Sequence, residues 1–279
     1  MIMRKLVLAG LLALATTSFA SAKDWKSVTI ALEGAYAPWN LTNPDGTLGG
    51  FEPELTAYLC KHAGLECKLI AQDWDGMIAA LNAGKFDVIM DALSITEERK
   101  QVIGFTVPYA ATPAAFATLK TGPLAKLAGT GTTIRLGTDA AEQKKASEPL
   151  RAALKGKTIG IQAATVYAKY IYDNFGDIAS VREYKTSAER DLDAVSGRID
   201  VAFDDVVYLN SAFEKPGNAD LALTGAEIAG PIWGEGEGLG IRKADTDLKA
   251  KFDEAIKAAL ADGTVKKLSL KWFKVDVSP

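Results

Sequence analysis

The chain has 279 residues, of which 32 are basic and 35 acidic, giving a formal net charge of −3 at pH 7. This length suits one large domain or two lobes of ordinary size. Mild acidity without a basic cluster argues against a nucleic-acid partner. The single histidine supplies neither a metal cluster nor a nucleophile–base pair, so we expect no metal, no cofactor and no catalytic residues.

The N-terminus has the order of a secretory signal peptide. Arg4 and Lys5 precede an apolar run over 6–15, and Ala20-Ser21-Ala22 precedes Lys23. A membrane anchor is the alternative, but the run is only half of the ~20 residues that cross a bilayer. We therefore predict export and cleavage after Ala22. Removing Arg4 and Lys5 leaves 30 basic against 35 acidic residues, a net charge of −5.

Along the rest of the chain, short β-branched runs alternate with helical patterns, which is typical of βαβ units and mainly parallel sheets. Strands are expected at 28–32, 67–71, 86–90, 114–119, 156–162, 198–203 and 238–242. Helices are expected at 51–63, 74–83, 95–102 with Ser94 as N-cap, 165–174 and 248–261. The segment 121–155 lacks a sustained apolar face and is expected to be a surface insertion.

Cys60 and Cys67 are the only cysteines. In an exported chain an even pair predicts a disulfide, here between the end of one helix and the start of the next strand. A zinc site is the alternative, but it would need His62 and a fourth ligand that the sequence does not supply. His62 lies on a polar stretch and is expected to be solvated.

Polar and aromatic side chains follow four of the predicted strands, in the runs 33–39, 91–94, 163–165 and 204–205. The carboxyl ends of strands in an open α/β sheet bind ligands, so these groups are expected to share one edge. Arg99 can hold a carboxylate, Thr165 offers a hydroxyl and helix N–H groups, and Asp205 suits an ammonium. The alternatives are a solvated helix charge for Arg99, a simple cap for Thr165 and a helix start for Asp205.

Six short motifs lie along the mature chain: Tyr36-Ala37-Pro38, Gly50-Phe51-Glu52, Leu93-Ser94-Ile95-Thr96-Glu97-Glu98-Arg99, Pro108-Tyr109, Gly197-Arg198-Ile199-Asp200 and Ala261-Asp262-Gly263-Thr264. Together they resemble the polar amino-acid solute-binding proteins of ABC importers, over nearly all of the mature chain except 121–155. The resemblance implies an α/β fold of the type II, Venus-flytrap kind, with two mainly parallel sheets flanked by helices. Lobe 1 would comprise 23–112 plus 235–279 and lobe 2 would comprise 113–234, with hinge crossings near 111–113 and 234–238. It also implies a monomeric periplasmic protein that delivers its ligand to a membrane permease.

The resemblance implies roles for individual residues. Ser94, Arg99 and Thr165 would hold the ligand's carboxylate, while Asp205 and the Ala92 carbonyl would hold its ammonium. The side-chain slot would be lined by Tyr36 and Trp74, with Glu33 at its far end. A tryptophan face favours a flat guanidinium, so a cationic amino acid is expected. Asp91, Gln162 and Ala164 complete the predicted ligand-binding set.

Some residues depart from the family pattern. Asp91 and Ala92 stand where hydroxyl residues are usual, and Ala163-Ala164 replaces a glycine–threonine pair, which could leave room for a bulkier ligand. The run 33–39 is similar to opine binders, whose ligands include octopine and nopaline. Two alternatives remain: a dehydratase-like enzyme of the same fold that uses Glu33 or Asp91 as base, and a sensor for a membrane receptor.

Overall fold

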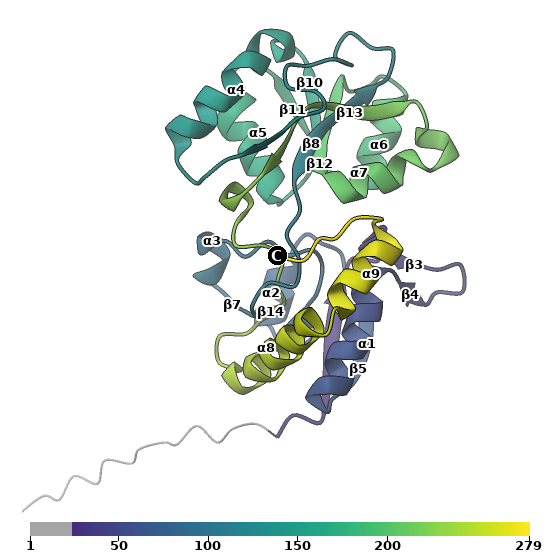
Figure 1. Cartoon of the computed structure of the whole chain (residues 1–279), viewed down its shortest axis with the longest axis vertical. Coiled ribbons are helices and arrows are strands. Elements are labelled where there is room, and N and C mark those ends of the chain that lie inside the picture. Colours follow the sequence, from purple (N-terminus) through teal and green to yellow (C-terminus); the bar gives the residue numbers. More distant parts are fainter. Residues whose placement is uncertain (1–23) are drawn as a thin grey trace, which may run out of the picture.

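The computed structural model describes residues 24–279 and shows two lobes joined by a narrow waist (Figure 1). One five-stranded sheet lies in the lower lobe of the figure, here called lobe 1, and one six-stranded sheet lies in the upper lobe, lobe 2. The two-lobed α/β fold predicted from the sequence is therefore confirmed. The predicted signal peptide, residues 1–22, lies outside the described residues.

Lobe 1 contains β1 (Ser27–Leu32), β5 (Glu66–Ala71), β6 (Val88–Ile89), β7 (Gly104–Phe105), β14 (Gly240–Ile241), α1 (Phe51–Ala63), α2 (Met77–Asn82), α3 (Glu97–Lys100), α8 (Thr246–Ala261) and α9 (Thr264–Trp272). The strand order in its sheet is β5-β1-β6-β14-β7. α1, α8 and α9 pack against one another beside the sheet. A small antiparallel sheet of β2 (Ala35–Tyr36), β3 (Asn40–Thr42) and β4 (Leu48–Gly49) follows β1.

α1 begins and ends as its sequence pattern predicts. Phe51, Leu55 and Leu59 recur every four residues and are fully buried, so they form the face that packs on the sheet. Gly64 then ends the helix with a φ of 66°, a left-handed conformation that glycine adopts without a Cβ clash. Cys60 at the end of α1 is joined to Cys67 at the start of β5, with 6.1 Å between their Cα atoms. The predicted disulfide is confirmed.

Lobe 2 contains β8 (Ala114–Leu119), β9 (Thr133–Arg135), β10 (Thr158–Gln162), β11 (Ser180–Tyr184), β12 (Val201–Asp205), β13 (Leu221–Ala229), α4 (Ala140–Leu154), α5 (Val166–Phe175), α6 (Ser187–Val195) and α7 (Val206–Phe213), with 3-10 turns at Pro216–Asn218 and Pro231–Trp233. The strand order is β11-β10-β12-β8-β13-β9. Figure 1 shows α4 and α5 on one side of this sheet and α6 and α7 on the other. The ends of β10 and β12 point toward lobe 1, which places Gln162 and Asp205 at the waist.

The segment 121–155 is not a surface insertion, so that prediction was wrong. β9 within it pairs in parallel with β13, and Leu124, Leu127, Leu150 and Leu154 are buried in the core of lobe 2. Its apolar side chains reach the core from separate elements: from turns, from a strand and from a helix. It has no continuous apolar face, although it is part of the core.

Two further expectations need correction. Both sheets are mixed: β8 pairs antiparallel with β12 and β13, and β14 pairs antiparallel with β6 and β7. β8 and β14 are the strands by which the chain enters a lobe from the other one, so no βαβ unit fixes their direction. The helix expected at 95–102 is only α3, and its N-cap is Thr96, whose hydroxyl accepts a hydrogen bond from Arg99 N at 3.2 Å. Ser94 instead forms a β-bridge with Glu237.

Two segments cross between the lobes, 106–113 and 234–239. They are bonded to each other, because Tyr109 N donates to Glu237 O and Glu237 N donates to Ala110 O, both at 2.8 Å. Gly234 and Gly236 in the second crossing have φ values of 104° and 110°. We propose that the lobes meet between residues 112 and 113 and between residues 234 and 235, because both positions lie within the crossings. None of the helices in residues 24–279 combines the length and apolarity needed to cross a bilayer.

Candidate ligand-binding site

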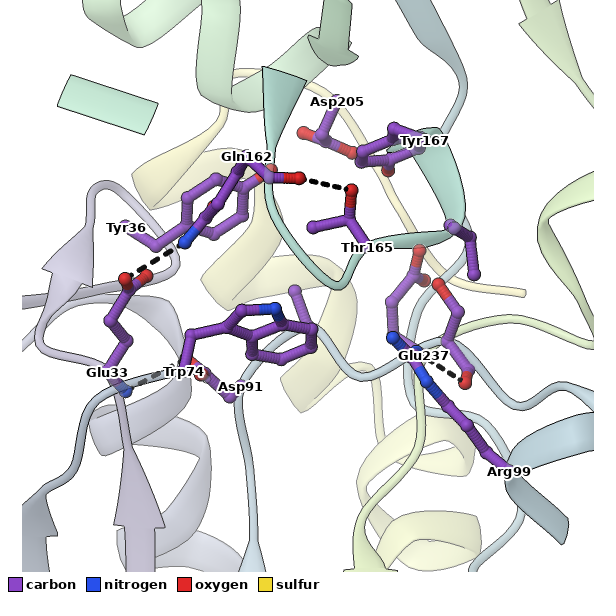
Figure 2. Close-up of a pocket in the computed structure, with 13 residues that line it drawn as sticks. Glu33, Tyr36, Trp74, Asp91, Arg99, Gln162, Thr165, Tyr167, Asp205 and Glu237 are labelled. Carbon is purple, nitrogen blue, oxygen red and sulfur yellow. Dashed lines mark hydrogen bonds between the residues drawn. The ribbon is translucent and has the colours of Figure 1, made fainter. Parts of the chain in front are cut away.

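A pocket lies between the lobes, at the carboxyl ends of β1, β6, β10 and β12 (Figure 2). It is partly open to solvent. All but one of the predicted ligand-binding residues line it: Glu33, Tyr36, Trp74, Asp91, Ala92, Ser94, Arg99, Gln162, Thr165 and Asp205. The exception, Ala164, lies in an adjoining groove that shares Arg99 and Thr165 with the pocket.

Arg99 is the single cationic side chain among the described residues that line the pocket. Its guanidinium donates to Ser94 O at 3.1 Å and Ala164 O at 3.4 Å, and it lies 5.4 Å from the centre of the Trp74 ring. Burial lowers the pKa of Arg99 to about 10, so it is charged at neutral pH. A guanidinium has five N–H donors, so three remain that could bind an acidic group.

Thr165 is the N-cap of α5. Its hydroxyl accepts from Ala168 N at 3.0 Å and donates to Gln162 O at 2.9 Å, so it is already used in capping the helix. The first N–H groups of α5 have no partner within the helix and lie at its positive end. This end of the pocket therefore offers helix N–H groups and a guanidinium, both suited to an anion.

Two acidic groups lie at the same end. Asp205 ends β12, accepts from Tyr208 N at 2.8 Å and is also bonded by the Thr112 hydroxyl. Burial raises the pKa of Asp205 to about 7. The Thr112 Oγ1 lies 3.2 Å from Glu237 Oε1, in the second crossing. Burial, and then the charge of Asp205, raise the pKa of Glu237 to about 8.

Glu33 marks the opposite end of the pocket. Figure 2 shows the Trp74 ring between it and Arg99. Gln162 Nε2 of lobe 2 donates to Glu33 Oε1 at 3.0 Å, and Trp74 Nε1 donates to Ala163 O at 3.1 Å, so both bonds cross between the lobes. Burial raises the pKa of Glu33 to about 7.

Asp91 lies beside the backbone of Glu33. Its Oδ1 accepts from Glu33 N at 3.0 Å and Asn40 Nδ2 at 2.7 Å, while its Oδ2 is buried without a partner among the described residues. Burial, and then the charges of Glu52 and Glu33, raise the pKa of Asp91 well above its ordinary value. The next residue, Ala92, has a φ of 42° and donates its N–H to the buried Glu52 at 2.7 Å.

Three lining residues were missed by the sequence reasoning: Val166, Tyr167 and Glu237. Val166 and Tyr167 follow Thr165 directly, so the predicted helix start implied them. Glu237 lies in the crossing predicted at 234–238. The alternation Gly234-Glu235-Gly236-Glu237-Gly238 could have identified it, since glycine on both sides lets the backbone approach a site closely.

Two α/β lobes around a polar cleft are the architecture of the solute-binding proteins. The chain matches the model of the bacterial extracellular solute-binding proteins, family 3, over residues 28–275, and it belongs to that family. It is 40% identical over 277 residues to the octopine-binding periplasmic protein of Rhizobium meliloti, covering 93% of this chain and 94% of that protein. It is 33% identical over 278 residues to the L-arginine-binding protein of Pseudomonas aeruginosa, covering 99% and 98%.

A solved structure is also similar: a periplasmic His/Glu/Gln/Arg/opine family-binding protein from Silicibacter pomeroyi in complex with lysine. Its TM-score is 0.73 at 32% identity, covering 90% of this chain and 99% of that chain. These relatives are named as binding proteins and not as enzymes. The family and the fold predicted from the sequence are confirmed, and a dehydratase-like activity is not supported.

Proposed function

We propose that this chain is exported to the periplasm, captures a cationic amino acid of the arginine type or an arginine-derived opine, and delivers it as a monomer to the permease of an ABC importer. The charge of the pocket carries the proposal. Four carboxyl groups line it, those of Glu33, Asp91, Asp205 and Glu237, against one guanidinium. A cationic ligand favours the ionised forms of these carboxyl groups and is attracted to them, whereas an acidic ligand would oppose their ionisation.

The arrangement of these charges favours an amino-acid-like molecule. At one end, Arg99 and the start of α5 suit a carboxylate, and Asp205 suits an ammonium. At the other end, Glu33 and the Trp74 ring suit a distal guanidinium. The names of the relatives support both ligand types: octopine for one and L-arginine for another.

Closure would follow from the division of these groups between the lobes. Glu33, Trp74 and Arg99 belong to lobe 1, while Thr165 and Asp205 belong to lobe 2. A ligand that contacts both sets stabilises the closed form, and hinge closure of periplasmic binding proteins is the general precedent.

Calorimetry with L-arginine, octopine, L-glutamate and L-leucine tests the proposal. We expect L-arginine or octopine to bind most tightly, and Arg99→Ala and Asp205→Ala each to weaken that binding at least tenfold, as expected for one lost charge-assisted hydrogen bond. Preference for L-glutamate or L-leucine would overturn it. Mass spectrometry of the secreted protein tests export, with Lys23 expected as the first residue.

A further inference from the structure

Glu237 is held so that its side chain enters the pocket. Its backbone is bonded on both sides to the first crossing, by Tyr109 N and Ala110 O. Its neighbouring glycines pack closely against the rest of the fold, because a Cβ on Gly236 would lie 2.5 Å from Ala110 O and one on Gly238 would lie 2.7 Å from Ile95 Cδ1. Glu237 is 4% exposed and lines the pocket beside Arg99 (Figure 2).

The carboxyl group of Glu237 is incompletely bonded. Its Oε1 lies 3.2 Å from Thr112 Oγ1, but the single hydrogen of that hydroxyl also bonds Asp205 Oδ2. Glu237 Oε2 is buried with no partner among the described residues. Because buried polar atoms without a partner are costly and rare, this oxygen is expected to bond a group that enters the pocket.

The groups that face Glu237 identify the kind of ligand atom it would meet. They come from four elements: Asp205 at the end of β12, Tyr167 on α5, Tyr109 on the first crossing and, near Tyr167, Arg99 from α3. This end of the pocket thus has two carboxyl groups and one guanidinium. One ligand carboxylate balances Arg99, which leaves two carboxyl groups for the ligand's positive end.

We propose that Glu237 is a second acidic partner of the ligand's ammonium group, beside Asp205. This assignment rests on the function proposed above and adds a specificity-determining residue from the hinge. A primary ammonium has three N–H donors and a secondary one has two, so either can bond both carboxyl groups. Glu237 belongs to neither sheet, so it contacts the ligand from the crossing itself.

An ammonium group bound by Glu237 and Asp205 would change the protonation of both carboxyl groups. With its pKa raised to about 8, Glu237 is mostly protonated at neutral pH before an ammonium arrives, and Asp205 is partly protonated at its pKa of about 7. A bound cation favours the ionised forms, so binding releases protons. Affinity for an ammonium-bearing ligand therefore rises as the pH increases from 6 to 8 and levels off above the pKa of Glu237.

Calorimetry of Glu237→Gln tests the assignment, using L-arginine and 5-guanidinopentanoate, which lacks the α-ammonium. Titrations at pH 7.5 in two buffers with different ionisation enthalpies give the number of protons released. Glu235→Gln is the matched control: Glu235 lies two residues away, its side chain is 61% exposed, and its partner is the surface residue Lys100.

We expect Glu237→Gln to bind L-arginine at least tenfold more weakly and to release fewer protons, with 5-guanidinopentanoate binding changed less than twofold and Glu235→Gln behaving as wild type. Equal L-arginine affinity and equal proton release in wild type and Glu237→Gln would overturn the assignment alone. If the wild type bound neither L-arginine nor octopine, the proposed function would fall and the assignment with it.

Discussion

Tyr36 of lobe 1 donates a hydrogen bond to Asp204 of lobe 2, with 2.7 Å between Oη and Oδ1. The Tyr36 ring also stacks on Tyr208 of lobe 2, with 4.7 Å between ring centres and 7° between planes. Asp204 is fixed from behind by the buried Arg190 and by Ser187 Oγ at 2.5 Å. The carboxylate that Tyr36 meets across the cleft is thus held in place by a buried guanidinium, which Asp204 shares with Asp191.

Tyr36→Phe removes this hydrogen bond and keeps the ring stacking. A neutral-to-charged bond of this kind is worth about 1 kcal/mol or more, so ligand affinity should fall roughly fivefold through a less stable closed form. Small-angle X-ray scattering with saturating ligand should show a larger fraction of open molecules. Tyr58→Phe is the control, because Tyr58 bonds Asp262 within lobe 1. Unchanged affinity in Tyr36→Phe would show that the contact does not contribute to closure.

Glu33→Gln should reduce the preference for a cationic ligand. The proposed partner of Glu33 is the distal guanidinium, so the ratio of affinities for L-arginine and its neutral isostere L-citrulline should fall by about tenfold. Competition binding measures that ratio directly. Asp73→Asn serves as control, since the exposed Asp73 pairs with Lys185 across the mouth of the cleft at 2.9 Å. A ratio equal to that of the wild type would place the guanidinium elsewhere.

The stability of the ligand-free protein should fall as the pH rises from about 4 to 8. Burial raises the pKa of Glu33 and Asp205 to about 7 and that of Glu237 to about 8, against about 4 in the unfolded chain. Between these values the folded state binds more protons than the unfolded state, so the free energy of unfolding decreases with pH and then levels off.

Urea unfolding at pH 5.5 and 8.5 measures this dependence. The double variant Glu33→Gln/Glu237→Gln should show a smaller difference between the two pH values, because neither amide titrates. A wild-type protein that is more stable at pH 8.5 would contradict the raised pKa values.

Removing the disulfide should lower stability without altering binding. Cys60 and Cys67 are seven residues apart, and closing so short a loop stabilises a fold by about 2–3 kcal/mol. Cys60→Ser/Cys67→Ser should therefore unfold at a temperature several degrees lower, as measured by calorimetry. Its affinity for ligand should match the wild type, since neither cysteine lines the pocket. A large loss of affinity would show that α1 positions the site through this bond.

The parts of the fold that follow from local pattern could be predicted from the sequence. α1 and the strand ends that bear Glu33 and Asp205 depend on periodicity and chain order, which one sequence displays. The buried leucines of 121–155 could not be found in this way, because they meet the core only through the pairing of β9 with β13.

The same limit applies within the site. Glu237 is separated from Asp205 by 32 positions, and only the bonding between the two crossings brings them to the same Thr112 hydroxyl. Thr165 is at its predicted position, but its hydroxyl caps α5. The sequence alone cannot show whether such a hydroxyl bonds its own helix or a ligand.

The strand order has a consequence for how the protein forms after synthesis. All strands of lobe 2 come from one continuous stretch, β8 to β13, whereas β14 lies between β6 and β7 in lobe 1. A chain that emerges from its N-terminus can complete the sheet of lobe 2 while the sheet of lobe 1 still lacks its internal strand. Lobe 1, whose strands are synthesised first, is therefore completed last. Until β14 is added, its exposed strand edges give the greatest risk of aggregation.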